Sequence, residues 1–242
     1  MCGIAGFVDK TIKNKEKVIK DMAERIKYRG PDGEGYFIDD DVALAHRRLA
    51  IIDLSSGGQP QYNEDKSLVI VFNGEIYNFV ELKSELKKSG HKFTNKSDTE
   101  VIIHGYEQWG TDVTKHLRGM FAFAIWDTKQ KTLFMARDGF GIKPLYYAKF
   151  GSSFMFASEI KAFLDHPKFK KELNKEILSS YLCFNSTPTE ETFFKGVYRV
   201  EPGYQILYKD GKINKTQFFK LEFDETDEDM DTIVKKIREA MD

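Results

Sequence analysis

Apolar residues recur along this chain with two different periods, and each period predicts a different kind of element. Val18, Met22 and Ile26 are four residues apart, which places them on one face of a helix. Short apolar or alternating runs rich in aromatic residues predict strands. The predicted helices cover 15–27 and 78–88, a segment beginning at 97–98, and shorter stretches near 159 and 176. The predicted strands cover 35–38, 42–49, 67–72, 120–126, 132–136, 145–149, 154–157, 193–200, 204–208 and 213–219.

Several of the predicted strands follow one another in hairpin-like succession, and the helices cluster between them. This order predicts an α+β fold with two layered sheets rather than a parallel βαβ fold. The stretch 224–231 is acidic and weakly apolar, which is typical of a linker, and 232–241 begins an amphipathic helix. We therefore expect one domain over 2–220, with 221–242 forming a linker and the beginning of a further domain.

Charge and cysteine content exclude several classes of protein. Lys and Arg (37) nearly balance Asp and Glu (38), so no excess of positive charge indicates nucleic acid or an anionic membrane as a partner. The apolar runs are too short to cross a bilayer and no signal peptide is evident, so the predicted location is cytoplasmic. The only cysteines, Cys2 and Cys183, exclude a disulfide framework. Cys183 lies in an apolar segment and is predicted to be a buried thiol.

A cysteine directly follows the initiator methionine. Removal of Met1 is expected because the next side chain is small, and it leaves one residue with both a thiol and a free α-amine. An α-amine has an ordinary pKa of about 7.7–8.0, so a neutral fraction can act as a base at physiological pH. The thiolate is the effective nucleophile, and a neighbouring base can generate it. A Met-Cys start alone is a weak signal, which the small residues at 3–6 strengthen.

A nucleophile that attacks an amide carbonyl needs hydrogen-bond donors for the developing oxyanion. Asn73 and Gly74 follow an apolar strand that is predicted to end there. The side-chain NH2 of Asn73 and the backbone N–H of Gly74 could point at one oxygen. The alternative is a tight Asn-Gly hairpin turn.

A free amino acid as substrate needs a cation for its carboxylate and anions for its ammonium group. Arg48 is the candidate cation, because Arg47 precedes it by one residue and faces the opposite side of the strand. Asp98 and Glu75 are the candidate anions. From spacing alone, a surface role for Arg48, a helix cap at Asp98 and a solvated Glu75 stay open.

Several motifs occur in order along the chain and together resemble one family. After the N-terminal CGI come RGPDG at 29–33, AHRRLAIID at 45–53, FNGEIYN at 72–78, SDTE at 97–100, GMFAFAIWD at 119–127 and RDGFGIKPLYY at 137–147. This series resembles the glutaminase domain, a glutamine amidotransferase of type 2, of glutamine-dependent asparagine synthetases. The resemblance covers residues 2 to about 220. It implies an N-terminal-nucleophile hydrolase fold, a four-layer αββα sandwich of two antiparallel sheets.

The resemblance also implies roles for individual residues, with L-glutamine as the substrate. Cys2 is the nucleophile and its α-amine the base, Asn73 and Gly74 form the oxyanion hole, Arg48 binds the glutamine carboxylate, Glu75 and Asp98 hold its ammonium group, and backbone around Ile51 and Ile52 lines the same pocket. Glutamine hydrolysis then yields glutamate and ammonia.

In such enzymes a C-terminal synthetase domain uses ATP and magnesium to activate aspartate, and the ammonia amidates it to asparagine. This chain has neither the SGG-x-DS pyrophosphate loop nor a GxxxxGK motif. ATP and magnesium are therefore expected only in a further domain, and no cofactor is expected here. No metal is expected either, because the five histidines show no ligand spacing. A homodimer is left open. The rival functions are the glutaminase half of another amidotransferase, and a catalytically silent regulatory domain of the same fold.

Overall fold

The protein forms two six-stranded sheets that pack face to face, as seen in a computed structural model that describes residues 1–50, 57–223, 225 and 227–241. In sheet A the strand order is β10 (Val197–Arg199), β8 (Tyr146–Phe150), β9 (Ser153–Ala157), β1 (Gly3–Val8), β3 (Val42–Arg48) and β2 (Gly33–Ile38). In sheet B it is β12 (Lys212–Gln217), β11 (Tyr204–Lys209), β7 (Thr132–Arg137), β6 (Gly119–Asp127), β5 (Leu68–Ile76) and β4 (Gln61–Tyr62). Every neighbouring pair is antiparallel.

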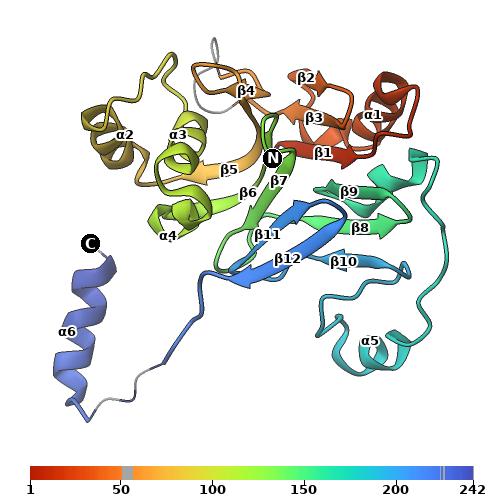
Figure 1. Ribbon diagram of the computed structural model, residues 1–242. Coiled ribbons are helices and arrows are strands. Elements are labelled where there is room, and N and C mark those ends of the chain that lie inside the picture. Colours follow the sequence, from red (N-terminus) through yellow and green to blue (C-terminus); the bar gives the residue numbers. More distant parts are fainter. Residues whose placement is uncertain (51–56, 224, 226, 242) are drawn as a thin grey trace.

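Helices cover the outer faces of the two sheets (Figure 1). Helix α1 (Lys15–Glu24) lies on sheet A, and helices α2 (Phe79–Lys88) and α3 (Thr99–Trp109) lie on sheet B. The remaining helices are α4 (Val113–His116), α5 (Leu178–Phe184) and α6 (Met230–Met241), with 3-10 turns at Lys27–Arg29, Gly110–Asp112 and Ile160–Asp165.

Three apolar layers hold the sandwich together, and strand alternation assigns side chains to them. Leu44 of β3 and Val71 of β5 point into the layer between the sheets. Residues one step away point outward: Ala43 packs beneath α1, and Ile70 packs against α2 and α3. This period of two is what a sheet with both faces buried requires. The α+β class and the four-layer αββα architecture predicted from the sequence are confirmed.

Strand β5 is longer than the sequence predicted. It runs through Asn73 and Gly74 to Ile76, because β6 continues to pair with it as far as Gly119 opposite Ile76. The Asn-Gly pair is therefore inside a strand, and the hairpin-turn alternative is wrong. Sequence patterns miss this extension because the pairing partner lies more than forty residues away along the chain.

Other element predictions also differ from the structure. Strand β1 was not predicted, since the small residues at 3–6 weaken a strand pattern. The helix expected near 159 is a 3-10 turn, and of the strand expected over 193–200 only Val197–Arg199 is present. Cys183 is exposed on α5 rather than buried, because no residue of that short helix is buried.

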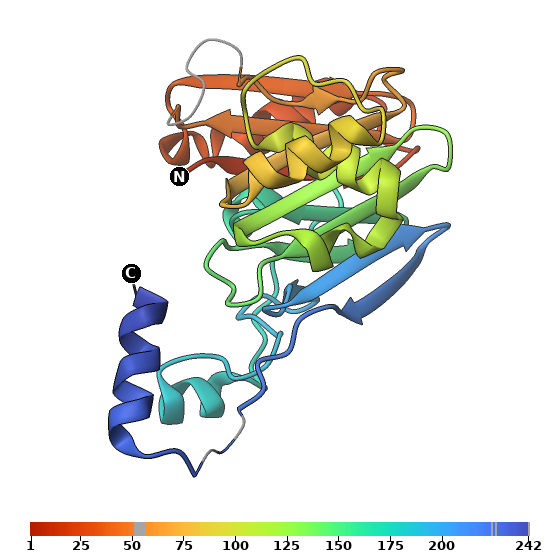
Figure 2. The ribbon, with the colours of Figure 1, turned by 90° about the vertical axis from the view of Figure 1, so that its left-hand side faces the viewer.

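Helix α6 stands apart from both sheets (Figures 1 and 2). None of its residues is buried, and Met230, Val234, Ile237 and Met241 leave an apolar stripe exposed. This spacing of three and four residues is that of an amphipathic helix. Among the described residues, no helix is long and apolar enough to span a bilayer.

Candidate active site

One end of the layer between the sheets opens into a pocket of about 580 Å³, part of which is open to solvent. The N-terminus, the last residues of β3 and β5, and the start of α3 meet at this end (Figure 1). Six of the predicted site residues line the pocket: Cys2, Arg48, Asn73, Gly74, Glu75 and Asp98. The other two, Ile51 and Ile52, lie outside the described residues.

Strand β3 sends two adjacent arginines to opposite sides, as strand alternation predicts. Arg47 is buried toward α1, where its guanidinium forms ion pairs with Glu24 at 2.7 Å and with Glu34. Arg48 lines the pocket instead. The choice of Arg48 over Arg47 as the pocket cation is therefore supported by position.

The side chain of Asn73 is almost completely buried at the inner face of sheet B. It points into the same inter-sheet layer as Val71, two residues earlier, but at the pocket end of β5. Only 1% of Asn73 is exposed, and its Nδ2 atom has no hydrogen-bond partner among the described residues. A buried donor without a partner costs free energy, so it is a site that a ligand acceptor can satisfy.

The backbone of β5 offers a second donor beside Asn73. N–H groups alternate between the two edges of a strand. Phe72 N–H donates to Gln59 Oε1 at 2.6 Å, and Ile76 N–H donates to Asp98 Oδ2 at 2.8 Å. Gly74 lies midway between these two residues, so its N–H points to the same edge, toward the pocket.

Glycine at position 74 is required by the close approach of β6. A Cβ atom there would lie 2.2 Å from the carbonyl oxygen of Met120 and 2.7 Å from Cα of Phe121. Real Cβ atoms do not come this close to backbone, so any side chain would push the strands apart. Only glycine therefore lets β5 and β6 pair this closely, and that pairing fixes the position of the Gly74 N–H donor.

Asp98 places a carboxylate in a buried position at the pocket wall. It is 6% exposed and occupies the N-cap of α3, but its side chain makes no cap hydrogen bond. Its Oδ2 accepts from Ile76 N–H of sheet B instead. Asp98 thus has the position of a helix cap but does not form the cap hydrogen bond. Burial, with a smaller contribution from the charge of Glu75, raises the pKa of Asp98 to about 6.

The thiol of Cys2 is held at the pocket wall by the backbone of Leu49. Leu49 N–H donates to Sγ at 3.4 Å, and Sγ lies 3.6 Å from Leu49 O. Arg29 Nε donates to the Cys2 carbonyl at 3.0 Å and fixes the backbone at this end. Burial raises the pKa of the Cys2 thiol, while the Leu49 hydrogen bond and the charges of the N-terminus, Arg48 and Lys143 act to lower it.

His46 is a pocket residue that the sequence reasoning missed, although it lies two residues before Arg48 and so on the same face of β3. It is 1% exposed, and burial lowers its pKa to about 3, so the imidazole is neutral. Nε2 lies 3.1 Å from the Phe72 carbonyl, which can only accept, so Nε2 carries the proton. His46 thus ties β3 of sheet A to β5 of sheet B.

Gln59 and Lys143 also line the pocket without having been predicted. The amide of Gln59 bonds both backbone groups of Phe72, with Nε2 donating to the carbonyl at 3.1 Å. Lys143 is buried, in the loop after β7, and its backbone N–H donates to Asp138 Oδ2 at 3.0 Å. No periodicity marks loop residues such as these, since tertiary contacts position them.

A model of the glutamine amidotransferase domain family matches residues 1–219. The chain belongs to this family. The match covers both sheets and every described residue of the pocket.

Two curated relatives of this glutamine amidotransferase domain are asparagine synthetases (glutamine-hydrolysing). One, from Bacillus subtilis (strain 168), is 42% identical over 246 residues, which is 100% of this chain and 39% of the relative. Another, from Oryza sativa subsp. japonica, is 47% identical over 169 residues, which is 68% of this chain and 28% of the relative. The chain thus spans well under half the length of these relatives.

A solved structure shares the fold. The glutamine phosphoribosylpyrophosphate amidotransferase of B. subtilis superposes with a TM-score of 0.67 over 90% of this chain and 49% of that one. Sequence identity is 20%, so this likeness concerns the fold alone. It agrees with the N-terminal-nucleophile hydrolase fold expected from the sequence.

Proposed function

We propose that this domain hydrolyses the side-chain amide of L-glutamine with Cys2 as the nucleophile. The observation that carries the proposal is the pocket itself. One thiol, one buried amide donor without a described partner (Asn73), one arginine (Arg48) and a buried carboxylate (Asp98) converge there. This set matches the four chemical parts of glutamine that must be held or attacked.

Charged side chains of the pocket bind the two charged groups of the substrate. Arg48 offers a bidentate fork to the glutamine carboxylate. Asp98 and Glu75 accept from its ammonium group, and an ammonium near Asp98 returns the pKa of that carboxyl toward its ordinary range. The side-chain amide is then directed toward Cys2, at the N-terminal end of β1.

The chemical steps need only the groups of the chain and water. The Cys2 α-amine takes the thiol proton, and the thiolate forms a bond to Cδ of glutamine. Asn73 Nδ2 and Gly74 N–H stabilise the oxyanion. The protonated amine gives its proton to the departing nitrogen, the C–N bond breaks, and ammonia leaves. Water then hydrolyses the γ-glutamyl thioester to glutamate and restores the thiol.

Met1 decides whether the base exists. With Met1 attached, the nitrogen of Cys2 is an amide and cannot accept a proton. Met1 is 52% exposed and lines the pocket beside Cys2. Burial raises the pKa of the Cys2 thiol, and the adjacent amine is the base proposed to take its proton.

The ammonia is proposed to serve an ATP- and magnesium-dependent synthetase domain that amidates aspartate, with residues 2–220 as the glutaminase unit and 221–242 as the link. The lengths of the curated relatives support a further domain. An apolar groove that includes the exposed Tyr77, Phe140 and Ile142 offers it a surface. The exposed stripe of α6 is in keeping with a helix that packs on another unit.

Ammonia release from glutamine tests the proposal, with the second cysteine as the matched control. Cys2→Ala should lower the rate at least about 10³-fold, because the nucleophile is lost. Cys183→Ala should keep the parent rate, since that thiol is exposed on α5 and does not line the pocket. Release by Cys2→Ala at the parent rate would sink the mechanism. A parent chain with a free Cys2 amine but no glutaminase activity would favour the silent regulatory alternative.

A further inference from the structure

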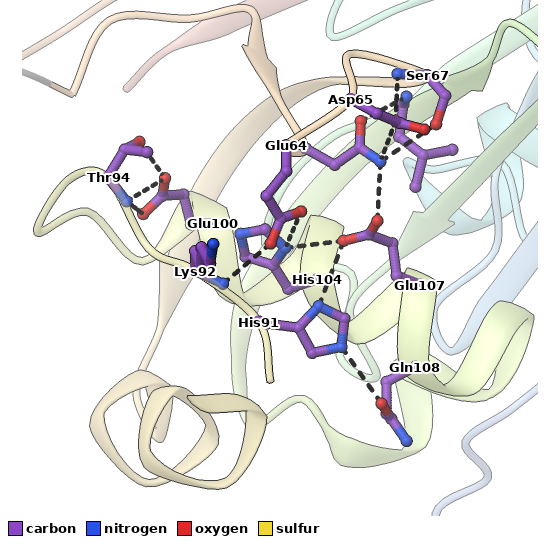
Figure 3. A network of polar contacts seen from close by, with 12 residues as sticks. Glu64, Asp65, Ser67, His91, Lys92, Thr94, Glu100, His104, Glu107 and Gln108 are labelled. Carbon is purple, nitrogen blue, oxygen red and sulfur yellow. Dashed lines mark hydrogen bonds and ion pairs between the residues drawn. The ribbon is translucent and has the colours of Figure 1, made fainter. Parts of the chain in front are cut away.

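Outside the pocket, four side chains of metal-ligand type converge beside helix α3 (Figure 3). They come from three separate segments: Glu64 from the turn between β4 and β5, His91 from the segment after α2, and His104 and Glu107 from α3. One ligand atom from each residue lies within 4.8 Å of all the others.

The distances within this His-Glu cluster are those of groups that share one centre. His104 Nδ1 lies 2.8 Å from Glu107 Oε2 and 3.6 Å from Glu64 Oε2. His91 Nδ1 lies 3.5 Å from the same Glu107 oxygen. Ligands at Zn–N and Zn–O distances in a tetrahedral site are about 3.3 Å apart, so small side-chain adjustments suffice for all four to reach one ion.

Neighbouring groups hold the outward-facing atoms of three ligands. Asn63 Nδ2 donates to Glu107 Oε1 at 2.8 Å, and Lys92 N–H donates to Glu64 Oε1 at 2.9 Å. His91 Nε2 lies 3.2 Å from Gln108 Oε1, as Figure 3 shows. Outer partners of this kind orient metal ligands and set the histidine tautomer.

The hydrogen bond of His91 to Gln108 determines which of its ring nitrogens presents a lone pair to the cluster. If Nε2 of His91 donates to Gln108, its Nδ1 presents a lone pair to the Glu107 carboxylate. His104 Nδ1 lies 2.8 Å from Glu107 Oε2, so the nitrogen and oxygen atoms of the cluster face a common centre. His104 is 1% exposed, and its Nε2 has no partner among the described residues, so this imidazole is the buried member of the cluster.

We propose that Glu64, His91, His104 and Glu107 bind one divalent transition-metal ion of the zinc class. Two imidazoles and two carboxylates suit such an ion, whereas calcium and magnesium prefer oxygen ligands alone. The proton on His104 moves from Nδ1 to Nε2 as Nδ1 becomes a ligand. No electron transfer or bond cleavage is involved.

The ion acts as a clip for the helix that carries Asp98. It joins the β4–β5 turn to α3. The furthest ligand on that helix, Glu107, lies nine residues after the N-cap Asp98. Strand β4, which precedes this turn, already bonds the segment before α3, because Gln61 Nε2 donates to Ser97 Oγ at 3.1 Å. Metal binding therefore stabilises the segment that forms one pocket wall, without an ion entering the pocket.

Titration of the whole, chelator-treated chain with ZnCl2 in a calorimeter tests this site. A Cys2→Ala/Cys183→Ala background removes both thiols as ligands. One Zn²⁺ should bind per chain, and it should raise the melting temperature by several degrees. His91→Ala should weaken binding at least about tenfold, as should Glu107→Gln. His116→Ala is the matched control, an exposed histidine of the same helical layer outside the cluster, and should bind as the parent does.

Glu64→Gln keeps the test decisive if changes on α3 impair folding. Its side chain is 38% exposed, so the fold should tolerate the exchange, yet one ligand oxygen loses its charge. Absence of saturable binding by the folded parent would overturn the proposal. Equal affinity in the parent, His91→Ala and Glu64→Gln would also overturn it and leave a protonated histidine network only.

Discussion

The layer between the two sheets is built differently in its middle and at its pocket end, although the same strands pass through both. In the middle, Leu44 of β3 and Val71 of β5 are completely buried and apolar. Two residues further along each strand, on the same face, stand His46 and Asn73. The backbone pairing continues without interruption, so the two regions differ only in residue type. The middle has apolar side chains that pack, and the pocket end has polar side chains that can bind a ligand.

The two regions also differ in how well their groups are satisfied. Core side chains pack against one another, whereas Nδ2 of Asn73 has no partner among the described residues and the carboxylate of Asp98 is buried with a raised pKa. Such groups destabilise the empty fold. The pocket end therefore lowers the stability of the empty fold, and its donors and charges are available to a polar ligand.

The largest expected effect is a loss of turnover caused by a substitution at the pocket end of β5. Asn73→Ala should lower turnover on glutamine about 10²–10³-fold, equivalent to about 3–4 kcal/mol, because one oxyanion donor is lost. Its free energy of unfolding should not fall, since the buried amide nitrogen that is removed has no described partner and its loss offsets the lost packing. Steady-state ammonia release and urea denaturation measure the two quantities.

The matched variant for Asn73→Ala is Val71→Ala, two residues earlier on the same face. It should cost about 2–3 kcal/mol of stability and leave the turnover of the folded enzyme unchanged. If both variants lost stability equally, or both lost turnover equally, the distinction between packing end and chemical end would fail.

A smaller effect is expected at the adjacent arginines. Arg48→Lys should raise KM for glutamine about 10–100-fold, because a lysine cannot form the bidentate contact with a carboxylate. Arg47→Lys should leave KM near the parent value, since Arg47 pairs with Glu24 and Glu34 on the other side of the strand. Initial-rate kinetics decide the point, and an equal rise in KM for both variants would contradict the assignment.

The smallest expected effect concerns stability and its pH dependence. The folded-state pKa of Asp98, about 6, lies above its ordinary value of 3.8, so the folded chain binds this proton more tightly than the unfolded chain does. The ionised carboxylate therefore destabilises the fold above pH 6, and this penalty fades as pH falls through 6 toward 4. Asp98→Asn should raise the free energy of unfolding by about 2 kcal/mol at pH 8 and by little near pH 4.

Denaturation of parent and Asp98→Asn across this pH range checks the prediction. A stability difference that did not vary with pH would show that Asp98 is not a buried, weakly compensated acid. In the same variant, glutamine should bind more weakly at pH 8, because the ammonium group loses its anion.

Local patterns in the sequence predicted those site features that depend on one strand alone. Alternation distinguished Arg48 from Arg47, and the same rule could have added His46, which shares the face of Arg48. The fold class followed from the order of strands and helices. The chemistry of the residues also suggested roles for Cys2, Asn73, Gly74, Glu75 and Asp98, whereas Ile51 and Ile52 came from the resemblance to a family alone. All of these roles stay proposals.

The features that the sequence did not predict depend on contacts between distant segments. The extension of β5 through Gly74 depends on β6, and the position of Lys143 depends on a loop held by Asp138. The His-Glu cluster has ligands from three segments, so a search for regular histidine spacing could not find it. Burial of Cys183 was wrongly predicted because apolar neighbours do not show what a short helix packs against.

The most direct test of the account is covalent labelling of the mature chain by a reactive glutamine analogue, followed by mass measurement of the intact protein and its peptides. The account predicts one adduct per chain, located on the sulfur of Cys2, only in molecules that have lost Met1, and slowed by added L-glutamine. A folded sample with a free Cys2 amine that takes up no label, or that takes it up at Cys183 instead, would contradict it.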